Sequence, residues 1–142
     1  MEATQEKTLQ HEAAALTVTE TRTPFSDLDE EVKRALHYAS EKKAFDMVAL
    51  DLREVASFTE FFLIFSGANT RQAQAISDEI EEQLKKQLNV RAVRIEGYRT
   101  AEWILMDYGD FIVHIFDKDS RDFYDLERLW RDAKRVELPE EI

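Results

Sequence analysis

A run of five apolar residues at positions 61–65 constrains the fold of this chain more than any other feature. The run contains only Phe, Leu and Ile, so an extended strand here is apolar on both of its alternating faces. Such a strand needs cover above and below, which it finds in the middle of a sheet that is flanked by helices. The run therefore predicts an α/β fold around a central buried strand.

Helical and extended patterns surround this strand. A helix is predicted from a cap at Ser26 to the lysines at 42–43, because apolar residues recur there at helical spacing. A second helix is predicted from a cap at Asn69 to Leu88, for the same reason. Further strands are predicted at residues 47–52, 92–96, 103–108 and 111–116.

The last two strands are joined by Gly109-Asp110, a pair that favours a two-residue hairpin turn. A closing helix is predicted to begin near a cap at Asp119. Its expected buried residues are Phe123, Leu126, Leu129 or Trp130, and Ala133. The order of elements predicts a mixed β-sheet flanked by helices.

The ends of the chain are expected to lie outside the folded unit. Residues 1–24 show neither sustained periodicity nor a signal-peptide or transit-peptide pattern, and we expect a disordered acidic tail. The domain is expected at residues 25–134, followed by an acidic C-terminal tail at 135–142. No stretch approaches the roughly 18 apolar residues of a membrane span, so a cytoplasmic protein without membrane contact is expected.

The formal net charge of −11 limits the kinds of partner. An acidic surface repels phosphate backbones, so we expect no direct, sequence-specific binding of nucleic acid, and a basic protein fits better. The absence of cysteine excludes disulfides, thiolate nucleophiles and cysteine zinc sites.

No set of residues indicates catalysis. The Ser66-Gly67 turn lacks the glycine pattern and lysine of a phosphate-binding loop. The Asp-x-Asp pairs at 27/29 and 117/119 lie at predicted helix starts, where capping explains them better than metal binding. His114 has Asp107 and Asp110 across the hairpin as conceivable partners, and a structural histidine that is hydrogen-bonded to the sheet is expected rather than a general base, because no nucleophile is evident beside it. We expect no enzyme activity, metal or cofactor.

The strand at 103–108 is open to two interpretations. Trp103 and Leu105 alternate with Ile104 and Met106, so the two pairs face opposite sides of the sheet. One interpretation is a strand that the protein's own helices cover on both faces. The other is a binding surface around Trp103, because Trp, Tyr and Arg dominate the energy of protein interfaces.

Several motifs occur in an order that closely resembles the ribosomal silencing factor family, also called Iojap-like proteins. The resemblance covers residues 26–133. Its motifs are residues 46–53, 62–67, 71–76, 96–99, 103–110 and 124–130.

The resemblance implies a nucleotidyltransferase-like fold without the catalytic carboxylates. It also implies binding to the large ribosomal subunit through its fourteenth protein, which blocks joining of the small subunit and restrains translation when nutrients are scarce. The residues that correspond to the family's contact strand, followed by their neighbours, are Trp103, Ile104, Leu105, Asp107 and Tyr108, then Tyr98 and Arg99. Two alternatives stay open: a divergent nucleotide-binding protein, and a module that forms homodimers.

Overall fold

The structure is a computed structural model that describes residues 22–142. The tail expected at residues 1–24 lies mostly outside this range, so only its last residues can be compared. Of these, Thr23–Pro24 form a short strand, β1, at one edge of the sheet. Among residues 22–142, no helix is both long and apolar enough to cross a membrane.

A seven-stranded sheet has the order β1-β7-β2-β3-β6-β5-β4. At its centre β3 and β6 run parallel, in register from Phe61 opposite Phe111 to Gly67 opposite Asp117. The next pairs on either side of this centre are antiparallel, and the β1–β7 pair at one edge is parallel, so the predicted mixed sheet is confirmed. The remaining bounds are β2 Phe45–Asp51, β3 Phe61–Gly67, β4 Arg94–Glu96, β5 Trp103–Asp107, β6 Phe111–Asp117 and β7 Lys134–Glu137.

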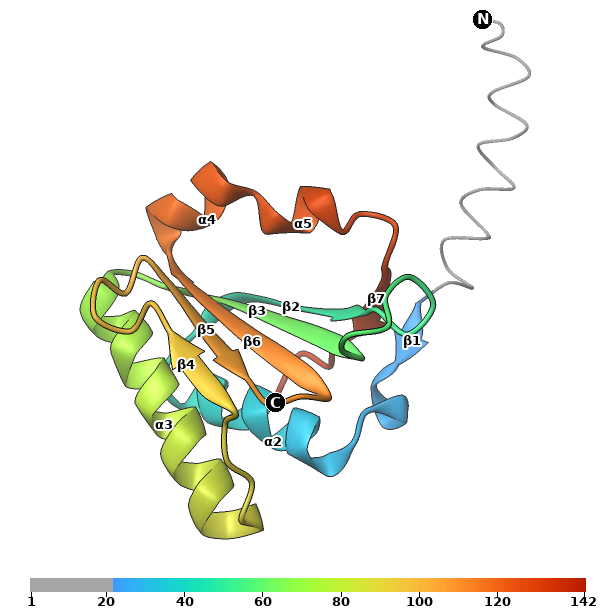
Figure 1. Cartoon of the computed structure of the whole chain (residues 1–142), viewed down its shortest axis with the longest axis horizontal. Coiled ribbons are helices and arrows are strands. Elements are labelled where there is room, and N and C mark those ends of the chain that lie inside the picture. The colour runs from blue at the N-terminus through green and yellow to red at the C-terminus, as the bar shows by residue number, and fades with distance from the viewer. Residues whose placement is uncertain (1–21) are drawn as a thin grey trace, which may run out of the picture.

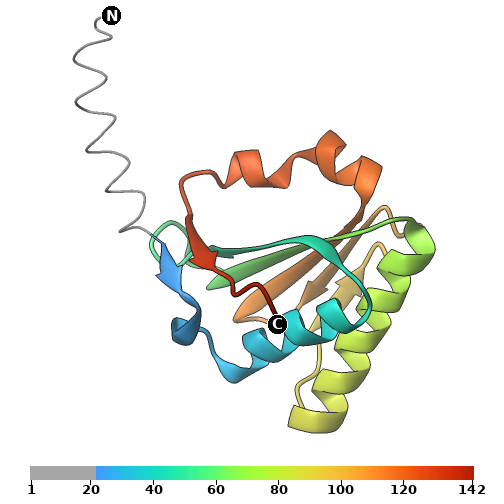
Figure 2. The ribbon, with the colours of Figure 1, turned by 180° about the vertical axis from the view of Figure 1, so that it is seen from behind.

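Two long helices, α2 (Glu30–Glu41) and α3 (Thr70–Leu88), cover one face of the sheet (Figures 1 and 2). The predicted cap of α3 is confirmed, since the Asn69 side chain accepts a hydrogen bond from the Gln72 backbone N–H at 2.9 Å. The fully buried residues of α3 lie on its face toward the sheet. These are Ala73, Ile76, Ile80 and Leu84.

The first helix starts later than predicted. Phe25–Asp27 form a short 3-10 helix, and Ser26 therefore does not cap α2. The backbone of Leu28 is extended while its side chain is buried, so the α-helix begins only after Asp29. The predicted hairpin is confirmed, with Gly109 at φ 87°, a conformation that favours glycine. The strand expected at 92–96 is confined to β4.

The opposite face lies beneath α4 (Lys118–Tyr124) and α5 (Leu126–Leu129), which form an arch in Figure 1. The single closing helix that we predicted is wrong. Asp117, not Asp119, caps α4, and Asp125 adopts a left-handed conformation that separates the two helices. This break leaves Phe123 80% and Leu129 77% exposed, against the prediction, whereas Leu126 and Ala133 are buried and Trp130 is half-buried.

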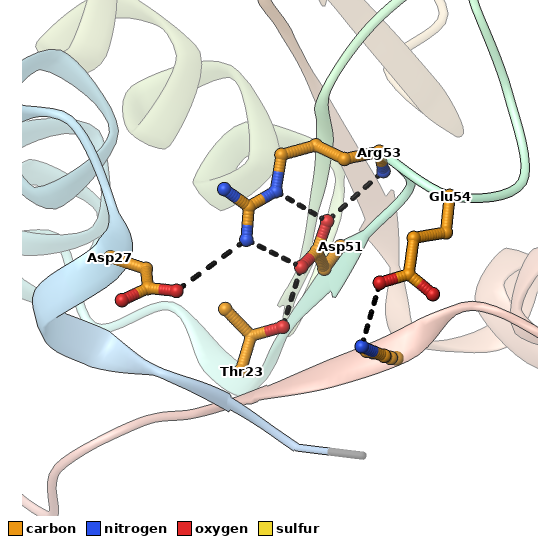
Figure 3. A network of polar contacts seen from close by, with 6 residues as sticks. Thr23, Asp27, Asp51, Arg53 and Glu54 are labelled. Carbon is orange, nitrogen blue, oxygen red and sulfur yellow. Dashed lines mark hydrogen bonds and ion pairs between the residues drawn. The ribbon is translucent and has the colours of Figure 1, made fainter.

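The C-terminal residues join the sheet. Strand β7 pairs with β1 and β2, and the Val136 side chain is buried, which differs from the tail expected at 135–142. A polar network holds this edge together (Figure 3): Asp51 accepts hydrogen bonds from Thr23 and Arg53. Burial opposes ionisation of Asp51, but these bonds outweigh it and lower its pKa to about 2.

Candidate docking surface

Strand β5 has one closed face and one open face. Ile104 and Met106 are 0% exposed and point toward the core between the sheet and α3. Trp103, Leu105 and Asp107 lie on the opposite face and are only half-buried. Since the arch leaves these side chains partly open, β5 is not covered on both faces by the protein's own helices.

Trp103 is held in place on this open face by its neighbours. Its ring centre lies 5.0 Å from that of Phe116 on β6 and 4.9 Å from that of Tyr124 on α4. Its indole N–H donates a hydrogen bond of 3.0 Å to Nδ1 of His114. The partner of His114 is therefore Trp103, not Asp107 or Asp110. Burial lowers the pKa of His114 to about 3, which keeps the imidazole neutral and able to accept.

A shallow pocket opens beside Trp103, and its lining combines aromatic and aliphatic side chains with two carboxylates. No lysine or arginine is among the residues that line it. These residues are Glu96, Gly97, Thr100, Glu102, Trp103, Leu105 and Tyr124. A lining that combines apolar and acidic side chains suits a partner surface that is basic and partly apolar.

The pocket depends on a tight turn before β5. Gly97 has φ 79°, and a Cβ atom there would lie 2.1 Å from the carbonyl oxygen of Trp103. Only glycine allows this approach, which brings residues 98–100 across the start of the strand. Arg99 is exposed on this turn. Tyr98 is also exposed, and its hydroxyl donates to Asp78 of α3 at 3.1 Å.

The predicted contact residues are thus only partly brought together. Ile104 is buried, so its side chain supports the sheet from below. Tyr108 is on the same side as Ile104, stacked on Phe111 at 4.9 Å, with a buried hydroxyl whose pKa is raised by burial. Asp107 is at the far end of β5, where it accepts a hydrogen bond from the Gly109 backbone at 2.8 Å.

Tyr124 was missing from the predicted set of contact residues. It comes from α4, about twenty positions along the chain from Trp103, and its ring forms one wall of the pocket. Its signal in the sequence is the motif at residues 124–130, but the side that this motif faces depends on the break at Asp125. Position along the chain alone does not indicate the contact.

The turn expected at Ser66-Gly67 is instead the last part of β3, and its polar groups are engaged within the protein. Arg121 of α4 hydrogen-bonds to the Ser66 hydroxyl at 2.7 Å and is paired with Glu127 at 3.1 Å. Gly67 packs closely on the first turn of α3, since a Cβ atom there would lie 3.0 Å from the Ala73 nitrogen. Within residues 22–142, no three His, Asp or Glu side chains are grouped to hold a metal ion.

The fold is that of a small α/β protein with a seven-stranded mixed sheet, and strand β5 is partly open on one face. The family model described as "Ribosomal silencing factor during starvation" matches residues 26–142, and the chain belongs to this family. A ribosomal silencing factor from Halalkalibacterium halodurans is 42% identical over 104 residues, which cover 73% of this chain and 88% of that protein.

Two further comparisons agree with the family. A crystal structure of a Chromobacterium violaceum protein has a TM-score of 0.70 at 30% identity, and the match covers 79% of this chain and 89% of that one. A more distant relative, the mouse "Mitochondrial assembly of ribosomal large subunit protein 1", is 29% identical over 93 residues, or 63% of this chain and 40% of that protein.

Proposed function

We propose that the open face of β5 docks on the large ribosomal subunit, through its fourteenth protein, and that the bound domain blocks the small subunit. Translation is thereby restrained when nutrients are scarce. The observation that carries the proposal is the half-buried Trp103 beside a pocket lined by apolar and acidic side chains. Membership of the silencing factor family supports it, and so does the name of the mouse relative, which refers to the large subunit.

The contact surface in this proposal is defined by exposure. Trp103, Leu105 and Asp107 contact the partner directly, together with Tyr124 from the arch. Tyr98 and Arg99 contact it from the turn before β5, where both are exposed. Ile104 and Tyr108 act from beneath, because their side chains pack toward the helices.

The charge of the protein favours a basic protein as the immediate partner. Glu102 and Glu96 are exposed and line the pocket, although Glu96 is paired with Arg94 at 3.4 Å, and the whole chain has a net charge of −11. Direct contacts with ribosomal RNA would bring these carboxylates against phosphates. The proposal therefore places a protein surface, rather than RNA, against β5.

The proposed mechanism is steric and is set in the cytoplasm. It requires neither a cofactor nor a chemical step, since a docked domain excludes the small subunit by its volume. The nucleotidyltransferase-like character of the fold stays a prediction. The ion pair of Arg121 with Glu127 weighs against the nucleotide-binding alternative, because it places a carboxylate beside Ser66, where it would repel a phosphate.

The test is sedimentation of purified ribosomal subunits with the protein and with Trp103→Ala. We expect the unchanged protein to migrate with the large subunit and to reduce the peak of joined ribosomes, and Trp103→Ala to do neither. Phe58→Ala is the matched control, because it removes an exposed aromatic ring at the opposite end of the same sheet face. Normal silencing by a folded Trp103→Ala protein would refute the proposed surface.

Self-association is a second candidate function, favoured by one observation. Phe123 and Leu129 are strongly exposed on the outer side of the arch, next to Tyr124. Exposed apolar side chains mark an interaction surface when they lie together, and Phe123, Tyr124 and Leu129 line the same shallow pocket. Sedimentation velocity over a range of concentrations tests it: a dimer that Phe123→Ser dissociates would support it, and a constant monomer would exclude it.

A further inference from the structure

His114 has a hydrogen-bonding pattern that the core does not require. The residue is 3% exposed, and its Nδ1 accepts the indole N–H of Trp103 at 3.0 Å. Because Nδ1 accepts, the proton of the neutral ring is on Nε2. Nε2 is buried without a hydrogen-bond partner among the described residues. An unpartnered buried donor is destabilising, and an aliphatic residue would fill the same space without it.

The imidazole is the fixed member of this pair. His114 lies within β6, between Ile64 on one side and Leu105 on the other. The edge of its ring packs against Phe62, with ring centres 4.4 Å apart and planes at 71°. Trp103 is the half-exposed member and the first residue of β5. The hydrogen bond therefore ties a surface ring to a rigid point in the sheet.

We infer that His114 is a positioning residue of the docking surface, which holds the indole of Trp103 in one orientation before a partner arrives. This inference rests on the proposed docking function and deepens it. A ring that is ordered in advance loses less conformational entropy when the partner binds. The stability lost at Nε2 is thus offset by tighter binding at Trp103.

The same bond limits what the partner meets at Trp103. Indole has a single polar hydrogen, and His114 already accepts it. The partner therefore contacts the ring face and edge, to which it presents an apolar or cationic group. It does not place a hydrogen-bond acceptor against the indole nitrogen.

Two substitutions of similar size separate this role from simple packing. His114→Asn places an amide oxygen near the position of Nδ1, whereas His114→Leu has nearly the same shape and no acceptor. The measurements are the Trp103 indole N–H resonance in ¹⁵N-labelled protein, assigned with Trp130→Phe, and the affinity for purified large ribosomal subunits. Each substitution is also made in the Trp103→Ala background.

We expect His114→Asn to keep the indole resonance near its original position and to bind like the unchanged protein. His114→Leu should shift the resonance and weaken binding about fivefold, the range expected for one additional side chain ordered on binding. In the Trp103→Ala background the two substitutions should bind equally, because the positioned ring is gone. The difference between the backgrounds measures the coupling between the two residues.

Full affinity of His114→Leu would overturn the inference, and so would a difference between the two substitutions that persists without Trp103. If Trp103→Ala itself binds normally, the proposed docking surface fails and the positioning role with it, although the resonance would still report the hydrogen bond. If His114→Leu does not fold, benzothienylalanine at position 103 breaks the same bond from the other side, since sulfur replaces the N–H. It should then weaken binding by the same factor, and unchanged affinity would refute the inference.

Discussion

The two faces of the sheet are covered to different extents. Beneath the sheet, α2 and α3 bury a continuous apolar core, in which Leu63, Phe65 and Ile104 are 0% exposed. Above it, the short helices α4 and α5 form an arch with little buried apolar surface of its own, and they leave Trp103 and Leu105 half-buried. We therefore expect the lower face to supply most of the stability, whereas the partly open upper face is the surface that the proposed docking uses.

Aromatic rings cross the upper face from one end to the other. Successive ring centres lie between 4.4 and 5.9 Å apart along the series Phe58, Trp130, Phe62, His114, Trp103 and Tyr124. Both ends of the series are exposed, at Phe58 and at Tyr124. Ring packing of this kind keeps a partly open surface ordered without a thick helical cover.

The largest effect on stability is expected on the lower face. Phe65→Ala removes a fully buried ring beneath the two long helices and should lower the free energy of unfolding by about 3–5 kcal/mol. Urea denaturation followed by circular dichroism measures it. A loss below about 1 kcal/mol would show that the lower face is not the main source of stability.

The next effect is expected in binding rather than in stability. Trp103→Ala removes the central ring of the upper face and should weaken binding to the large subunit by more than about 2 kcal/mol, as for other interface hot spots. Because the ring is half-exposed, its removal should cost only about 1–2 kcal/mol of stability. A variant that fails to fold would instead assign Trp103 to the core.

Acidification should lower the stability of the protein mainly through His114, which lies on the upper face. The pKa of His114 is lowered by burial from 6.5 to about 3, so between these values the unfolded chain binds a proton that the folded protein does not. Stability should therefore fall as pH drops below about 6.5, by up to about 1.4 kcal/mol per pH unit.

His114→Asn is the control for this pH dependence, since it removes the titrating group and should flatten the curve between pH 6.5 and 4. Asp51, on the edge of the sheet, acts at lower pH. The pKa of Asp51 in the folded protein is about 2, below the ordinary 3.8. The stability that its ionised carboxylate contributes is therefore lost only as pH falls from 3.8 to about 2. If the free energy of unfolding changed equally with pH in the unchanged protein and in His114→Asn, the role given to His114 would be contradicted.

The smallest effect is expected on the outside of the arch. Phe123→Ser changes a side chain that is 80% exposed, so the free energy of unfolding should change by less than about 0.5 kcal/mol. Thermal unfolding measures it. A large loss of stability would mean that Phe123 is buried in solution, for example in a dimer.

The sequence was sufficient to predict the features that depend on local pattern. The doubly apolar run became β3, Asn69 capped α3, and Gly109-Asp110 formed the hairpin turn. That turn also fixes the register in which Leu105 faces His114, and Trp103 then lies diagonally from His114 on the same face. The hydrogen bond between Trp103 and His114 could thus have been predicted from the sequence, although only Asp107 and Asp110 were considered as partners of His114.

The break in the arch and the strand at the sheet edge could not be predicted from the local sequence, because both depend on tertiary structure. An aspartate in the left-handed conformation at position 125 ends α4, and nothing in the local helical pattern marks it. Strand β7 has only four residues, too few for alternation to stand out from an acidic tail. The contribution of Tyr124 to the site depends on the break at Asp125, so it followed from the structure and not from the motif.

The most direct test of the proposed function compares two leucines that are changed to the same residue. Leu105→Arg places a cation on the open face of β5, and Leu129→Arg places one on the outside of the arch. We expect Leu105→Arg to abolish migration with the large ribosomal subunit, because it repels a basic partner, and Leu129→Arg to leave it intact. Binding by folded Leu105→Arg, or its loss only in Leu129→Arg, would contradict the assignment of the docking surface to β5.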